Sequence, residues 1–109
     1  MSLLLSLSLV SCQEQSNEGE VTLVLRVLGN NETSQFAFKD ATLLDILKNK
    51  YEVKLKKIFY TEYVECINEV CANDEYSWLY YVNDKPMNLG VDVYKVKDRD
   101  VVLFAYRKV

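Results

Sequence analysis

The segment Tyr76–Asn83, with the sequence YSWLYYVN, decides the fold of this chain. Side chains alternate between the two faces of a strand, so Trp78, Tyr80 and Val82 are expected on one face. A second aromatic segment, VVLFAY at 101–106, follows a loop that contains the single proline of the chain. Two aromatic strands separated by a loop and a tight turn predict a small β-rich domain with an aromatic face.

Length and composition limit the chain to one domain. Its 109 residues are 50% hydrophobic, so one core can form. The net charge of −3 lacks the basic excess typical of nucleic-acid binding, so no nucleic-acid partner is expected. The absence of histidine removes the commonest general base and the commonest metal ligand. We therefore expect a protein that is not an enzyme.

The N-terminus resembles an export signal. An apolar run, too short for a bilayer span of about 20 residues, ends in LVSC at 9–12. This ending resembles the lipobox of exported prokaryotic lipoproteins, in which the cysteine, Cys12 here, carries the lipid. The resemblance implies a signal peptide at 1–11, a lipidated cysteine with a flexible tether at 12–20, and a domain at 21–109. We then expect an exported, membrane-anchored protein of the cell envelope, facing outside the cytoplasm. The alternative is that the apolar run forms a first strand of the domain.

The other two cysteines, Cys66 and Cys71, bracket a predicted hairpin turn at Asn68–Glu69. A two-residue turn places Ile67 opposite Val70 and the two cysteines opposite each other on the next rung. Cα atoms on that rung lie about 4.5 Å apart, within the range of a disulfide. The alternatives are a metal site, for which the further ligands of structural zinc are missing, and two free thiols in a reducing compartment. We expect the disulfide and no metal ion.

The remaining segments predict further strands and one helix. Alternating apolar residues predict a hairpin of strands at 21–28 and 33–38. Thr42 is a good N-cap and Asp45 follows it as a capping-box partner, so a helix is expected from Leu43 to Lys50. Shorter extended segments are expected at 53–60, 63–66, 70–71 and 91–96.

Several motifs share their order and spacing with one known family. They are TLLDIL at 42–47, IN at 67–68, WLYYVN at 78–83, Gly90, Tyr94 and the segment 98–106. Together they resemble the transcobalamin-like C-terminal domain family of exported microbial proteins. The resemblance implies an α+β, β-grasp-like domain, with a mixed, curled sheet of four to five strands packed on one short helix. The chain departs from the family pattern at Glu69, Asp84 and Arg99, where glycine is usual.

The family resemblance also bears on ligands. In cobalamin carriers the related domain closes over one face of the corrinoid, and a larger helical domain is needed as well. A corrinoid is therefore implied by analogy only, and no cofactor is expected from the residues themselves.

A binding site is expected on the aromatic strand and the loop after it, with Trp78, Tyr80, Asn83 and Met87 as candidate ligand-binding residues. Aromatic side chains combine a large contact area with a polar group, and methionine adapts to irregular ligands. The alternative for the two strand aromatics is core packing. Two functions stay open: a lipid-anchored binding module for a small molecule or surface component, and a structural or protein-interaction module without a small-molecule site.

The lysine-rich segment 48–57 is typical of a solvated surface, with contact to anionic lipid as the alternative.

Overall fold

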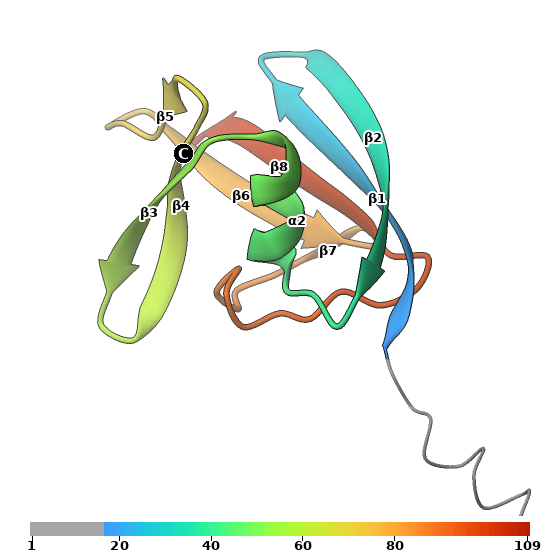
Figure 1. Cartoon of the computed structure of the whole chain (residues 1–109). Helices are drawn as coiled ribbons and strands as arrows, with labels where there is room; N and C mark the ends of the chain where they lie inside the picture. Colours follow the sequence, from blue (N-terminus) through green and yellow to red (C-terminus); the bar gives the residue numbers. More distant parts are fainter. Residues whose placement is uncertain (1–16) are drawn as a thin grey trace, which may run out of the picture.

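The computed structural model describes residues 17–109, which form two β-sheets and one short helix (Figure 1). The elements are β1 (Glu18–Val27), β2 (Asn30–Lys39), α2 (Leu43–Lys50), β3 (Val53–Ile58), β4 (Thr61–Ile67), β5 (Val70–Cys71), β6 (Tyr76–Val82), β7 (Lys85–Pro86) and β8 (Val101–Lys108). The larger sheet has five strands in the order β2-β1-β8-β6-β7, and the smaller sheet has the order β3-β4-β5. Strand β1 pairs in parallel with β8 while the other pairs are antiparallel, so the larger sheet is mixed, as predicted.

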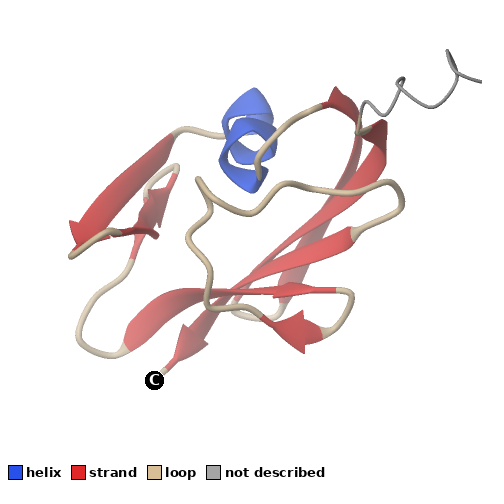
Figure 2. Ribbon diagram, turned by 90° about the horizontal axis from the view of Figure 1, so that it is seen from below, coloured by secondary structure: helices blue, strands red, loops and turns tan. Residues whose placement is uncertain are grey.

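Helix α2 begins and ends where the sequence predicts. The Thr42 hydroxyl accepts a hydrogen bond from the Asp45 backbone N–H, and the Asp45 carboxylate accepts one from the Thr42 N–H. This reciprocal capping box satisfies two backbone donors at the start of the helix. The apolar side of the helix is buried through Leu43, Ile46 and Leu47, and Figure 2 shows α2 as a separate layer on one side of the larger sheet. Within residues 17–109, no helix has the length and apolar character that a membrane span requires.

One hydrophobic core lies between the helix and the sheets. Its buried members come from α2, from both sheets and from the loop before β8. They are Val21, Leu23, Leu25, Phe38, Leu43, Ile46, Leu47, Tyr51, Val64, Ile67, Trp78, Tyr80, Val82, Val91, Val96, Val102 and Phe104. Because all of them lie between positions 21 and 104, the part of the chain that the structure describes closes a core by itself.

A buried carboxylate joins the turns at one end of the larger sheet. Asp100 is 5% exposed and accepts hydrogen bonds from Asn83 Nδ2 at 3.0 Å, the Tyr94 hydroxyl at 2.7 Å and the Lys97 backbone N–H at 2.9 Å. Burial and the hydrogen bond to this carboxylate raise the pKa of Tyr94, so its hydroxyl stays a donor. Three donors compensate the cost of removing the charge from water.

The hairpin of β4 and β5 contains the predicted disulfide. Cys66 pairs with Cys71 and Ile67 with Val70, in the predicted register. The two cysteines are bonded, with their Cα atoms 4.0 Å apart. In the turn between the strands Asn68 has a left-handed φ of 56°, which asparagine tolerates, whereas Glu69 is not among the residues with a positive φ. Glutamate can therefore occupy the position where the family usually has glycine.

The other two departures from glycine keep the glycine-like backbone. Asp84 has a φ of 71° and Arg99 a φ of 72°, both in the left-handed region. Aspartate tolerates this conformation better than arginine, whose side chain gains no local hydrogen bond to the backbone from it. Both positions therefore adopt a backbone conformation that glycine reaches more easily than the residues present.

Three expectations differ from the structure. Strand β1 begins at Glu18, so Glu18–Glu20 belong to the strand and not to the tether that was expected to reach residue 20. The segment 91–96, expected to be extended, begins with a turn at 91–93, where the Val93 and Tyr94 N–H groups donate to the Gly90 carbonyl, and only Lys95 forms an isolated β-bridge, with Thr42. Strands β3, β4 and β5 form a second sheet instead of joining the first. The predicted signal peptide and Cys12 lie outside the described residues.

Candidate functional site

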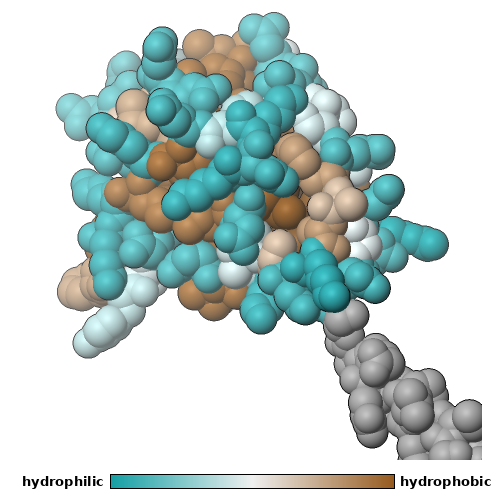
Figure 3. All heavy atoms as spheres, in the orientation of Figure 1, coloured by the Kyte–Doolittle hydropathy of each residue, from teal (hydrophilic) through white to brown (hydrophobic). Residues whose placement is uncertain are grey.

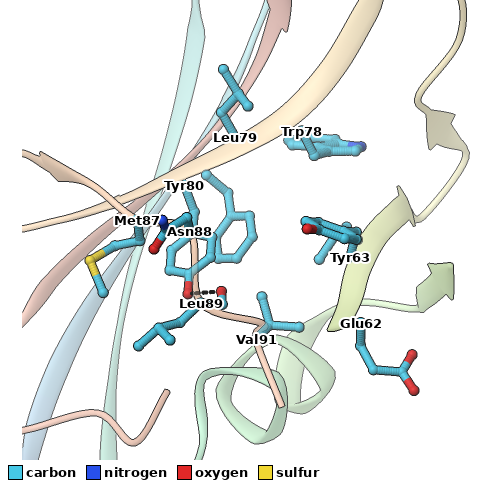
Figure 4. A pocket seen from close by; sticks show the side chains of 11 residues that line it. Glu62, Tyr63, Trp78, Leu79, Tyr80, Met87, Asn88, Leu89 and Val91 are labelled. Atoms are coloured by element: carbon cyan, nitrogen blue, oxygen red, sulfur yellow. Dashed lines mark hydrogen bonds between the residues drawn. The ribbon is translucent and has the colours of Figure 1, made fainter. Parts of the chain in front are cut away.

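A cavity of about 250 Å³ lies between β4 and β6, where the loop after β7 closes one side (Figure 4). Trp78, Tyr80 and Met87, three of the four predicted ligand-binding residues, line this cavity. The other lining residues are Glu62, Tyr63, Val64, Leu79, Asn88, Leu89, Val91 and Phe104. Most of this lining is apolar, and its polar groups are the Glu62 carboxylate, the Asn88 amide and the tyrosine hydroxyls.

The two aromatic residues of β6 are buried and fixed. Trp78 is 7% exposed and its indole N–H donates to the Val70 carbonyl at 3.0 Å. Tyr80 is 8% exposed, donates its hydroxyl proton to the Leu89 carbonyl, and stacks on Phe104 with ring centroids 5.1 Å apart. Both rings therefore belong to the core and also form part of the cavity wall, so the two interpretations of these residues are not exclusive.

The Tyr80 hydroxyl has a structural role at neutral pH. Burial, together with the negative charge of Asp92, raises the pKa of Tyr80 to about 12. The phenol is therefore neutral near pH 7 and remains a hydrogen-bond donor to the loop. A group with this pKa is poorly matched to general acid–base catalysis near neutrality.

The loop after β7 is held against both sheets. The Met87 N–H donates to the Tyr80 carbonyl at 3.0 Å, and the Leu44 N–H of α2 donates to the Val91 carbonyl at 3.0 Å. A Cβ atom at Gly90 would lie 3.3 Å from a backbone oxygen of β4, so the glycine allows the loop to approach that strand. These contacts give the cavity a defined wall on the loop side.

The fourth candidate, Asn83, is not among the residues that line the cavity. Its side-chain oxygen accepts from the Val101 N–H at 2.9 Å, and its amide nitrogen donates to Asp100. Both polar groups therefore serve the turn. Among residues 17–109, no three His, Cys, Asp or Glu side chains gather where they could hold a metal ion.

Several lining residues were not anticipated from the sequence. Leu89 lies in the loop after the aromatic strand, where the site was expected, so its position could have been included. Tyr63 and Val64 carry no comparable signal, because their approach to β6 depends on how the second sheet lies against the first. Phe104 was expected in the last strand, but its stacking on Tyr80 follows from the pairing of β6 with β8.

The fold and the cavity define a small mixed-sheet domain with one helix and an aromatic hollow. Comparison with known families identifies it further: the chain belongs to the family described as "Domain of unknown function (DUF4430)", which matches residues 40–108. No curated protein matches the chain.

Two solved structures share the fold. Haptocorrin in complex with Cbi superposes with a TM-score of 0.74 at 16% identity, over 84% of this chain and 25% of the haptocorrin chain. A "putative metal binding protein" from Ruminococcus gnavus ATCC 29149 gives a TM-score of 0.72 at 16% identity, over 84% of this chain and 99% of that chain. The chain thus spans about a quarter of haptocorrin. At this identity the likeness shows the fold alone, and it agrees with the transcobalamin-like fold that the sequence motifs predicted.

Proposed function

We propose that this domain is a non-catalytic binding module that holds an apolar ring or alkyl group in the cavity between β4 and β6. The observation that carries the proposal is the cavity of about 250 Å³ with its aromatic and methionine lining. An apolar cavity of about 150 Å³ binds benzene, so this volume accommodates one ring or two small fused rings. The ligand is a small molecule or a group on a surface component.

The size of the cavity limits how much of a ligand it encloses. Pockets for drug-sized ligands measure about 300–1,000 Å³, so a larger molecule would insert only one group. Tyr63, Leu79 and Leu89 line the cavity and are 47%, 40% and 47% exposed, so they offer apolar surface to the rest of such a molecule. The fold shared with haptocorrin makes a corrinoid one candidate, contacted at its edge. The metal in the name of the second neighbour is not carried to this chain, because residues 17–109 offer no cluster for it.

The proposed location is the outer side of a membrane. The Cys66–Cys71 disulfide supports an oxidising compartment. The lipobox-like LVSC sequence supports lipid attachment at Cys12, which would leave a short tether before β1. Expression in a host that processes lipoproteins tests this: Cys12→Ala should move the protein from the membrane to the soluble fraction. Unchanged partitioning would remove the anchor from the proposal.

Calorimetric titration tests the binding site. The probes are Cbi and a series of one-ring and two-ring aromatic compounds, and at least one should bind the wild-type protein. Leu89→Trp places bulk at the edge of the cavity and should weaken that binding at least about tenfold, which corresponds to 1.4 kcal/mol. Val93→Trp is the matched control, because Val93 is 57% exposed and does not line the cavity. Absence of binding, or equal effects of the two variants, would refute the site.

A further inference from the structure

The turn between β3 and β4 exposes an apolar tip, which we call the aromatic tip: Ile58, Phe59 and Tyr60. Phe59 is 88% exposed and Tyr60 94%, the highest values for large hydrophobic side chains in residues 17–109, and Ile58 is 43% exposed. Figure 1 shows this hairpin projecting beside the helix, and the corresponding projection in Figure 3 is pale and tan where its surroundings are teal. Only the inner part of the hairpin, through Val53, Leu55, Val64 and Ile67, contacts the core.

The backbone conformation of the turn does not favour a phenylalanine at position 59. Phe59 has a φ of 59°, a conformation that glycine or asparagine adopts more easily than a bulky aromatic residue. Its ring gains no burial within the domain in return. A strained and exposed aromatic residue is consistent with a contact made outside the domain.

The strand that leads to the tip is basic. Lys54, Lys56 and Lys57 are all exposed, and none of them forms an ion pair within the described residues. The two acidic residues on the other strand of the hairpin, Glu62 and Glu65, are only partly exposed. Lys54 and Lys56 share one face of β3, whereas Lys57 lies on the other face, opposite Glu62 in the strand register. Exposed positive charge therefore lies on both faces of the hairpin that carries the aromatic tip.

We propose that the aromatic tip inserts into the interfacial region of a bilayer that contains anionic lipid, with Lys54, Lys56 and Lys57 on the headgroups. Tyrosine and phenylalanine rings are suited to the boundary between headgroups and acyl chains, and each nearby lysine adds attraction to anionic lipid. A lysine also extends its alkyl stem along the apolar layer while its amine stays with the phosphates.

The position of the tip favours a bilayer as the partner. In Figure 1 the β3–β4 turn and the start of strand β1 lie toward the same, lower end of the molecule. Only six positions separate Cys12 from Glu18, so a lipid on that cysteine would hold this end within about 20 Å of the membrane. The inference does not need the anchor, which would only raise the effective concentration of the tip at the surface.

A second copy of the chain is a poorer partner for this surface. A symmetric contact between two tips would bring the lysines of both copies together, and like charges at an interface oppose association. An anionic bilayer instead satisfies the rings and the amines at the same time.

Co-sedimentation with vesicles tests the inference. The protein is the unlipidated segment 17–109, which closes its own core, so the result is independent of the anchor and of the ligand cavity. It should bind vesicles of phosphatidylcholine with phosphatidylglycerol more strongly than vesicles of phosphatidylcholine alone. Phe59→Ser and Tyr60→Ser should each lower the partition coefficient about tenfold. Replacing Lys54, Lys56 or Lys57 singly by glutamine should lower the partition coefficient about fivefold, and only for the vesicles that contain phosphatidylglycerol.

Leu28→Ser is the matched control. Leu28 is 65% exposed in the β1–β2 turn, which lies at the opposite end of the molecule in Figure 1, so its replacement should leave partitioning unchanged. In addition, Tyr60→Trp should show fluorescence that brominated lipids quench, whereas Trp78 is buried and should not respond. Circular dichroism must show that each variant is folded.

Three results would overturn the inference. The first is a wild-type segment that binds neither kind of vesicle. The second is an equal loss of binding for Leu28→Ser and the tip variants. The third is dimerisation through the aromatic tip: in sedimentation velocity the wild-type segment would then be a dimer and Phe59→Ser a monomer.

Discussion

Replacement of Trp78 by phenylalanine is the most informative single change, because the sequence alone allowed two roles for this residue, core packing and ligand binding. The indole is 7% exposed and its N–H donates to the Val70 carbonyl at 3.0 Å. Its ring also lies 5.1 Å from the ring of Tyr106, at an angle of 49°. Phenylalanine keeps an aromatic ring on β6 but loses the hydrogen bond and part of the ring volume.

The expected cost is about 2–3 kcal/mol of the free energy of unfolding. Loss of the hydrogen bond leaves the Val70 carbonyl without this partner and costs about 1 kcal/mol. The removed ring volume, about 40 Å³, enlarges the cavity and costs about 1 kcal/mol at roughly 24 cal/mol per Å³. The lost transfer free energy of the removed atoms accounts for the remainder.

Urea denaturation followed by far-ultraviolet circular dichroism measures this cost, since the variant has no tryptophan to report by fluorescence. For a domain of this size the same change lowers Tm by roughly 10–20 °C. Tyr81→Phe is the matched control. Tyr81 lies on the opposite face of β6 and its hydroxyl accepts an exposed hydrogen bond from Arg107, so the change should alter stability by less than about 0.5 kcal/mol. A cost below about 0.5 kcal/mol for Trp78→Phe would contradict its placement in the core.

Four other outcomes are expected. Leu47→Ala, at a side chain with 0% exposure, should cost about 2–5 kcal/mol in the same denaturation assay, and a cost below about 0.5 kcal/mol would remove α2 from the core. Replacing both Cys66 and Cys71 by serine should cost about 1–3 kcal/mol, because the closed loop is short, and alkylation without reductant should label neither thiol of the native protein. The pKa of Tyr80 is about 12 in the folded state against 10.0 for an exposed tyrosine, so its contribution to stability is complete below about pH 10 and is lost as the pH rises from 10 to 12. Tyr80→Phe should therefore reduce the loss of stability in this pH range. An unchanged dependence of stability on alkaline pH would contradict the raised pKa. Arg99→Gly should stabilise the protein by about 0.5–1 kcal/mol by relieving the left-handed backbone, and a lower Tm than wild type would show that the arginine side chain has a role of its own.

Elements whose partners lie close in the chain were predictable. Helix α2 is correct to the residue, because Thr42 and Asp45 form its capping box within one turn. The register of Cys66 opposite Cys71 was also predictable, because a two-residue turn leaves one choice of pairing. The expectation of an extended segment at 91–96 was wrong for residues 91–93, because hydrogen bonds to the Gly90 carbonyl bend the chain there, whereas Lys95 forms an isolated β-bridge with Thr42.

Part of the candidate site was also predictable. The aromatic pattern of β6 placed Trp78 and Tyr80 on one face, and the composition of the following loop pointed to Met87. Asn83 was expected at the site but lies in the turn after β6, because its amide bonds Asp100, a residue 17 positions away. The volume and boundaries of the cavity depend on Tyr63 and Phe104, which come from other strands.

The sequence by itself determined most of the local structure of this protein: the longer strands, the capped helix and the cysteine hairpin. Their hydrogen bonds and side-chain alternation are set by residues a few positions apart, so the pattern of side chains is sufficient. Only the tertiary structure decided that β1 pairs in parallel with β8, that β3 to β5 form a separate sheet, and that a cavity remains between β4 and β6. These features depend on contacts between distant segments, where many pairings satisfy the same local pattern and the packing of the whole core selects one.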